Sequence, residues 1–230
     1  MGRPPRITEP GTVYHLLNRR VMRLPLFQKD EDYEAFERVL AEGLDRPDAP
    51  NLLAYCLMPN HWHLVVHAGD RTDLSTWMQW VTVTHTHRWH AHYHTTGQGP
   101  LYQGRFKSFP VQEDAHFLTV CRYVEANALR ARLTDRAQDW PWASLSARRK
   151  RTAFLSHCLK PWPVNRPTNW TTQVNRPMDD RKLKMVRQSA KHGLPLGTDR
   201  WKEKIAKRLG LNAKPTPRGR PPRRNNNNSS

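Results

Sequence analysis

The chain of 230 residues has a mass of 26.9 kDa, enough for one or two domains that each bury a core without disulfides or metals. Lys and Arg number 38 against 20 Asp and Glu, and the net charge of +18 favours a polyanionic partner such as nucleic acid. Three cysteines at unrelated spacings argue against a disulfide framework, and no apolar run approaches the ~18 residues of a membrane span, so we expect a soluble cytoplasmic protein.

Apolar periodicity in the first 133 residues predicts an α+β domain. Alternating or β-branched runs indicate strands, and apolar residues three or four apart indicate helices. In chain order the pattern predicts a strand at 12–19, a helix at 30–44, a hairpin of strands at 52–58 and 61–68, a helix at 73–93, a strand at 106–111 and a helix at 114–133. We therefore expect a ferredoxin-like β-α-β-β-α-β sheet followed by an added helix.

The net charge is concentrated in the C-terminal part of the chain. Residues 1–140 hold 16 basic and 16 acidic residues, whereas residues 141–230 hold 22 basic and 4 acidic ones. This break predicts a neutral globular domain at 1–145 and a basic, partly helical region at 146–213. Within the latter, residues 199–211 have helical spacing and could dock on the domain or on DNA.

The last residues, 214–230, form a basic tail with few apolar side chains, which we expect to be disordered when free. Arg218 and Arg220 belong to an RGRP sequence similar to an AT-hook, in which an extended Arg-Gly-Arg enters a narrow minor groove. The alternative is a solvated tail that binds any phosphate backbone.

Four His-x-His pairs occur, and their context separates them. Only His61 and His63 lie in a predicted strand, where residues two apart share a face and Trp62 between them points to the other face. They are either two metal ligands or two hydrogen-bonded histidines that flank a core tryptophan. The histidines between residues 85 and 94 lie on a helix, where a solvated helix end is a simpler reading than a metal pair.

The helix at 114–133 places three polar side chains next to its apolar stripe. Tyr123, Asn127 and Arg130 follow one another at i, i+4 and i+7, and offer a phenol, a neutral oxygen ligand and a cation for phosphate. Two imidazoles and an amide oxygen would suit Mg²⁺ or Mn²⁺ bound together with a phosphate. Taken alone, an isolated tyrosine such as Tyr123 is more often a half-buried core residue than a nucleophile.

Cationic side chains near the predicted strands are candidates for DNA contacts. Arg105 and Lys107 alternate on one face of the strand, with Phe109 on the same face as a possible stacking platform and Phe106 on the other. Arg19 and Arg20 end the first strand. Each of these cations could instead be an ordinary exposed residue.

Several segments together resemble the REP-associated tyrosine transposases, a branch of the HUH single-tyrosine transposases that act on single-stranded DNA. The matching segments are YHLLNRR (14–20), LLAYCLMPNHWHLVV (52–66), LYQGRFKSFPV (101–111), CRYVEANALRARL (121–133) and WPWASL (140–145). Further matches in the C-terminal region are W..QVN.P (170–177), GLPLGTDRWKEKIAKRLGL (193–211) and RGRP (218–221).

The resemblance implies an assignment of roles. His61 and His63 would be the HUH metal ligands and Tyr123 the nucleophile. Asn127 would be the third ligand, at a position where some related transposases carry Gln. The implied substrate is single-stranded DNA at the foot of a hairpin in repetitive extragenic palindromes, cut through a 5′-phosphotyrosine link, by a monomer or homodimer at the nucleoid.

Two other functional classes remain open from the sequence. The sheet could belong to a non-catalytic regulator that reads structured DNA or RNA, as other ferredoxin-like sheets do. It could also belong to a metal nuclease that cleaves with water, which would not need Tyr123.

Overall fold

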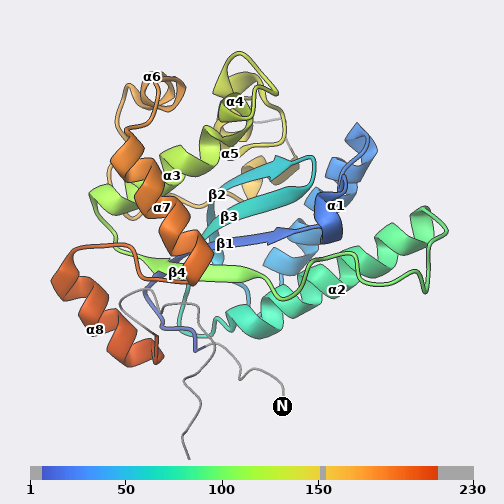
Figure 1. Cartoon of the computed structure of the whole chain (residues 1–230), viewed down its shortest axis with the longest axis horizontal. Helices are drawn as coiled ribbons and strands as arrows, with labels where there is room; N and C mark the ends of the chain where they lie inside the picture. The colour runs from blue at the N-terminus through green and yellow to red at the C-terminus, as the bar shows by residue number, and fades with distance from the viewer. Residues whose placement is uncertain (1–6, 151–153, 212–230) are drawn as a thin grey trace, which may run out of the picture.

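The computed structural model describes residues 7–150 and 154–211 and is built around a four-stranded antiparallel sheet. The strands are β1 (Val13–Arg19), β2 (Asn51–Met58), β3 (His61–His67) and β4 (Lys107–Val111), in the spatial order β2-β3-β1-β4 (Figure 1). β1 lies in the middle and pairs antiparallel with both β3 and β4. The predicted ferredoxin-like arrangement is confirmed.

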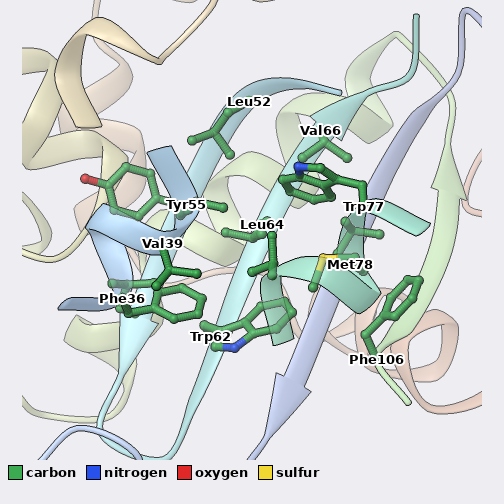
Figure 2. Close-up of a cluster of buried hydrophobic side chains, with 14 of the residues drawn as sticks. Phe36, Val39, Leu52, Tyr55, Trp62, Leu64, Val66, Trp77, Met78 and Phe106 are labelled. Atoms are coloured by element: carbon green, nitrogen blue, oxygen red, sulfur yellow. The ribbon is translucent and has the colours of Figure 1, made fainter. Parts of the chain in front are cut away.

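Each face of the sheet buries its own apolar cluster. Helices α1 (Asp30–Leu44) and α2 (Leu74–His92) cover one face, and α3 (Ala115–Glu125) covers the other. Trp62 of β3 is fully buried under α1, with its ring stacked 5.9 Å from that of Phe36 (Figure 2). Because side chains alternate along a strand, the burial of Trp62 turns its neighbours in β3 toward α3.

The helix predicted at 114–133 is divided in two. α3 ends at Glu125, Ala126 has ψ near 5°, and a short helix α4 (Asn127–Arg130) follows. The Tyr123 carbonyl accepts hydrogen bonds from the Arg130 guanidinium, at 3.3 Å from each terminal nitrogen. The break therefore lies between the two residues expected to share a site, Tyr123 and Asn127.

The C-terminal part packs against the same sheet. It contains the helices α5 (Ser144–Lys150), α6 (Trp170–Asn175), α7 (Asp180–His192) and α8 (Asp199–Leu209) and a 3₁₀ turn at Phe154–His157. Two further 3₁₀ turns lie earlier in the chain, at Val21–Arg23 and Ala137–Asp139. Trp170 and Val186 join the cluster under α3, and α7 lies across that side of the sheet next to β4 (Figure 1). The domain boundary predicted after residue 145 stays a prediction.

The helix predicted at 199–211 corresponds to α8, and its apolar residues Ile205 and Leu209 belong to the cluster under α1 and α2. Its apolar face therefore docks on the protein. Arg208 also pairs with Glu9 at 2.7 Å. None of the helices within the described residues is long and apolar enough to cross a membrane. The predicted tail at 214–230 lies outside the described residues.

Candidate functional site

A cavity of about 540 Å³ opens where β1, β3 and α3 meet. The antiparallel register places Arg19 opposite His61 and Leu17 opposite His63, so the end of β1 and the start of β3 form one wall. α3 contributes a single side chain, and α7 and the segment before β4 complete the rim. The lining residues are Leu17, Asn18, Arg19, His61, His63, Gln103, Gly104, Arg105, Lys107, Tyr123, Arg187, Ala190 and Lys191.

His61 and His63 both face this cavity, as the strand position of the pair predicts. Their ring centroids are 5.0 Å apart with the rings nearly perpendicular. Burial, aided by the positive charges of Arg19 and Arg130, lowers the pKa of His61 to about 4. Burial also holds the pKa of His63 well below its usual value. Both imidazoles are therefore neutral at pH 7, the form that a metal ion requires of histidine.

A third histidine, His15 of β1, supports this pair. Its Nε2 lies 2.9 Å from Nδ1 of His63, both rings are buried, and they stack with centroids 5.0 Å apart. This hydrogen bond engages Nδ1 of His63 and leaves Nε2 as the nitrogen for a ligand. We did not single out His15 from the sequence, although it is the histidine of the YHLLNRR segment and its strand was predicted.

Tyr123 comes to the histidines from α3. Its ring centroid lies 5.9 Å from that of His63, with the two rings perpendicular, and 6.3 Å from that of His15. The side chain is 9 % exposed and lines the cavity. The guanidinium of Arg130 covers the ring, 4.3 Å from its centroid. A phenol thus faces two neutral imidazoles across a solvent-open cavity.

Asn127 is the remaining member of the expected ligand set. Its Oδ1 accepts a hydrogen bond from Arg130, and among the described residues its buried Nδ2 has no partner. The described cavity lining does not include Asn127. Two neutral imidazoles and a half-satisfied amide fit Mg²⁺ or Mn²⁺ in donor type, provided that Arg130 releases the amide oxygen. Within the described residues no three His, Cys, Asp or Glu come together as a metal site.

Only some of the cations expected to contact DNA line the cavity. Arg19, Arg105 and Lys107 line the cavity. Arg20 packs elsewhere, with its guanidinium 4.3 Å from the ring centroid of Trp89 and a hydrogen bond to the Pro25 carbonyl. Arg130 is occupied by Asn127 and by the Tyr123 carbonyl. Arg218 and Arg220 lie outside the described residues.

The expectation that Phe109 offers a stacking platform is wrong for this conformation. Its side chain is 1 % exposed and packs against His15, with ring centroids 4.9 Å apart. Strand β4 begins at Lys107, so the alternation predicted from Arg105 holds only from Lys107 onward. Phe106 belongs to the opposite cluster, as expected.

Helix α7 supplies two cations that sequence reasoning missed. Arg187 and Lys191 stand one turn apart and line the cavity together with Ala190. Their i, i+4 spacing was visible in the sequence, but nothing there indicated which part of the chain α7 covers. The first part of the chain, whose net charge is zero, and the basic second part therefore share one site.

The histidines of α2 do not all form a solvated helix end. His85 is buried, and its Nδ1 lies 2.7 Å from the Tyr102 hydroxyl. Burial lowers its pKa to about 3. His90 is half-buried and hydrogen-bonds with the Thr95 hydroxyl, whereas His87, His92 and His94 are exposed. The expectation of solvated residues is wrong for His85, which packs with the rings of Phe27 and Phe36.

Comparison with known proteins gives a family and a fold. The family model described as "Transposase IS200 like" matches residues 10–127, more than half of the chain. A solved structure described as a REP-associated tyrosine transposase bound to a REP hairpin is similar, with a TM-score of 0.53 and 18 % sequence identity. The alignment covers 73 % of this chain and 93 % of that one. No curated protein matches the chain.

Proposed function

The chain belongs to the IS200-like transposase family, and from this premise we propose that it is a metal-dependent single-stranded DNA endonuclease and strand transferase. It would act at hairpin-forming repetitive extragenic palindromes through a 5′-phosphotyrosine intermediate. The observation that carries the proposal is the meeting of Tyr123 with the neutral pair His61 and His63 in one cation-lined cavity.

In this proposal Tyr123 is the nucleophile. Its phenolic oxygen attacks a DNA phosphorus in line, and the bond from phosphorus to the 3′ oxygen breaks. The phenol loses its proton during the attack, and the leaving 3′ oxygen gains one and becomes a hydroxyl. The DNA then remains joined to Tyr123 through its 5′ phosphate, and a 3′-hydroxyl can reverse the step. No nucleotide cofactor is needed because the phosphodiester energy is kept in the new bond.

His61, His63 and Asn127 are the residues that would hold the metal ion. Mg²⁺ or Mn²⁺ bound there would supply Lewis-acid polarisation of a non-bridging phosphate oxygen and help to orient the phosphate. His15 holds the ring of His63 through Nδ1. Asn127 can join once Arg130 turns from its amide oxygen, which would also free a guanidinium for the phosphate.

The cations of the rim would hold the strand. Arg19, Arg105 and Lys107 stand on the sheet side of the cavity, and Arg187 and Lys191 on the α7 side. Contacts from both sides would fix a phosphate beside Tyr123 without reading base sequence. The hairpin would supply the selection of the site, as suggested by the similar structure, which is bound to a REP hairpin. The basic tail would add contacts to duplex DNA. Either a monomer or a homodimer at the nucleoid could carry out the proposed strand transfer.

Formation of a covalent protein–DNA adduct tests the proposal. End-labelled DNA hairpins with randomised single-stranded flanks are incubated with the protein and Mg²⁺ or Mn²⁺, and adducts are separated under denaturing conditions. We expect an adduct with the wild type and with Tyr93→Phe, a tyrosine on the far side of the sheet, but none with Tyr123→Phe.

Other outcomes would identify the competing functions. Cleavage by Tyr123→Phe at the wild-type rate would indicate a nuclease that uses water. Tight binding without cleavage or adduct by the wild type would indicate a binding regulator. Either result would overturn the proposed role of Tyr123.

A further inference from the structure

A second cavity, of about 660 Å³, adjoins the one that contains Tyr123. It lies between α2 and the segment that precedes β4, and its volume falls within the range typical of sites for small organic ligands. Three residues, Asn18, Gly104 and Arg105, line both cavities.

The ridge between the two cavities is formed by the residues that line both, and hydrogen bonds of Asn18 hold it in place. Asn18 Nδ2 donates to the Gly104 carbonyl at 3.1 Å, and its Oδ1 accepts from the Arg19 amide at 2.9 Å. Gly104 has φ +150°, a conformation that favours glycine, and its position carries no side chain to block passage. Arg105 follows directly on the ridge. An extended strand can therefore cross here with a phosphate near Arg105.

The walls of the second cavity suit an uncharged planar group. Its floor is formed by the buried residues Leu101, Tyr102 and Phe106. On the α2 side, the Thr82 and Thr86 hydroxyls donate to the backbone carbonyls of Met78 and Thr82 at 2.7 Å. Those hydroxyl hydrogens are therefore engaged within α2, and the hydroxyl oxygens keep lone pairs that can accept a hydrogen bond.

The rim of the second cavity adds a hydrogen-bonding side chain and no negative charge among the described residues. Gln79 is exposed and adds an amide that can both donate and accept. None of the described lining residues is acidic. An apolar floor with a few hydrogen-bonding groups above it matches the chemistry by which proteins read unstacked bases.

We propose that this cavity binds an unpaired nucleobase of the DNA strand next to the phosphate that Tyr123 attacks. The inference rests on the proposed function, because the strand reaches the cavity from the catalytic one across the ridge of Asn18 and Gly104. With the phosphate backbone held at Arg105, the base inserts between α2 and the floor residues. The cavity thus fixes which phosphate of a single strand stands beside Tyr123.

Photo-crosslinking and a cavity-filling variant test this site. The probe is a pool of single DNA strands of random sequence in which thymidine is replaced by 4-thiothymidine. Bound to Tyr123→Phe protein and irradiated, these strands should crosslink to peptides that contain residues 79–87 or 100–106. Val83→Trp, which places an indole in the cavity from an exposed position, should weaken binding of the same strands by about tenfold, the contribution of one stacked base.

Ala91→Trp is the matched control, because Ala91 is exposed on the same helix but does not line the cavity. It should bind the strands as the wild type does. Equal binding by Val83→Trp and Ala91→Trp, or crosslinks confined to other peptides, would overturn the subsite. Adduct formation by the wild type in that case would leave the proposed function intact. Crosslinks in this cavity without any adduct at Tyr123 would overturn the proposed function instead.

Discussion

In the proposed metal site, His15 would prepare the neighbouring ring of His63 to bind a cation. For Nε2 of His63 to bind a cation, its Nδ1 must carry the proton, and His15 Nε2 stands 2.9 Å away to accept it. Burial lowers the pKa of His15 to about 3, so the ring stays neutral and keeps an acceptor nitrogen at neutral pH. The stacking of the two rings also limits rotation of His63.

Replacement of His15 should therefore weaken metal binding without unfolding the protein. We expect His15→Phe to lower the affinity for Mn²⁺ by about 10–100-fold, since outer partners of ligand histidines have effects of this size. Free Mn²⁺ measured by electron paramagnetic resonance gives the affinity directly. His85→Phe is the control, because His85 is also buried and hydrogen-bonded but packs on the opposite face. An equal loss of affinity in both variants would contradict the role of His15.

Sequence reasoning found the side chains whose chemistry is visible locally and missed those that depend on the fold. His61, His63 and Tyr123 stand in a strand and a helix whose faces could be predicted, and the structure brings them together. Arg187 and Lys191 reach the same cavity only because α7 packs beside β4. Arg20 and Phe109 point into packed surroundings, which no local pattern revealed.

At the scale of elements, α1 is tied to β2 by a buried acid. Glu37 of α1 is 3 % exposed, and its Oε1 accepts from the Tyr55 hydroxyl of β2 at 3.1 Å. Burial raises the pKa of Glu37 to about 7, and the hydrogen bond from Tyr55 only partly offsets this rise. The folded protein therefore binds this proton more tightly than the unfolded chain.

The raised pKa of Glu37 should make the free energy of unfolding fall as the pH rises. The contribution of Glu37 is fully present below pH 4.5, its unfolded pKa, and is lost as the pH rises to about 7. Over this window we expect the free energy of unfolding of the wild type to fall by up to about 3 kcal/mol relative to Glu37→Gln. Urea unfolding at several pH values measures the difference. Glu31→Gln, on the exposed side of α1, should follow the wild type; parallel curves for Glu37→Gln and the wild type would refute the link.

The elements of the first part of the chain were predictable because α1 and α3 carry a helical apolar stripe and the strands are short apolar runs bounded by turn residues. The strands and helices from β1 to β4 begin within two residues of the predicted positions. The division of α3 from α4 was not predictable, since it accompanies the contact of Arg130 with the Tyr123 carbonyl. Helices α6 and α7 were not predicted; α6 has only six residues, and α7 has only Val186 and Ser189 among its buried residues.

At the scale of the whole molecule, part of the positive charge of the C-terminal region lies at the cavity that contains Tyr123. α7 brings two cations of the basic part to the cavity, and Glu125 of α3 accepts hydrogen bonds of 2.6 Å from Ser144 and Trp170. The second part of the chain thus both supports the helix that carries Tyr123 and contributes to its surroundings. The tail beyond residue 213 would add attraction of longer range.

Deletion of residues 214–230 should separate the contribution of the tail to DNA binding from that of the cavity cations. The deletion removes five Lys and Arg and no acidic residue, so the slope of log K against log salt for duplex DNA should flatten by up to about 4.5. The rate of adduct formation at saturating DNA should not change, because Tyr123 and the cavity cations remain. Fluorescence anisotropy across salt concentrations measures the slope. An unchanged slope would show that the tail makes no phosphate contacts.

Mass spectrometry tests most directly the covalent bond that we propose between Tyr123 and the 5′ phosphate of a cleaved strand. Hairpin strands are incubated with the protein and Mn²⁺, the DNA is digested with nuclease, and tryptic peptides are analysed. We predict a nucleotide linked through its 5′ phosphate to Tyr123 and a released strand that ends in a 3′-hydroxyl. Cleaved strands together with unmodified Tyr123, or a nucleotide on another residue, would contradict the account.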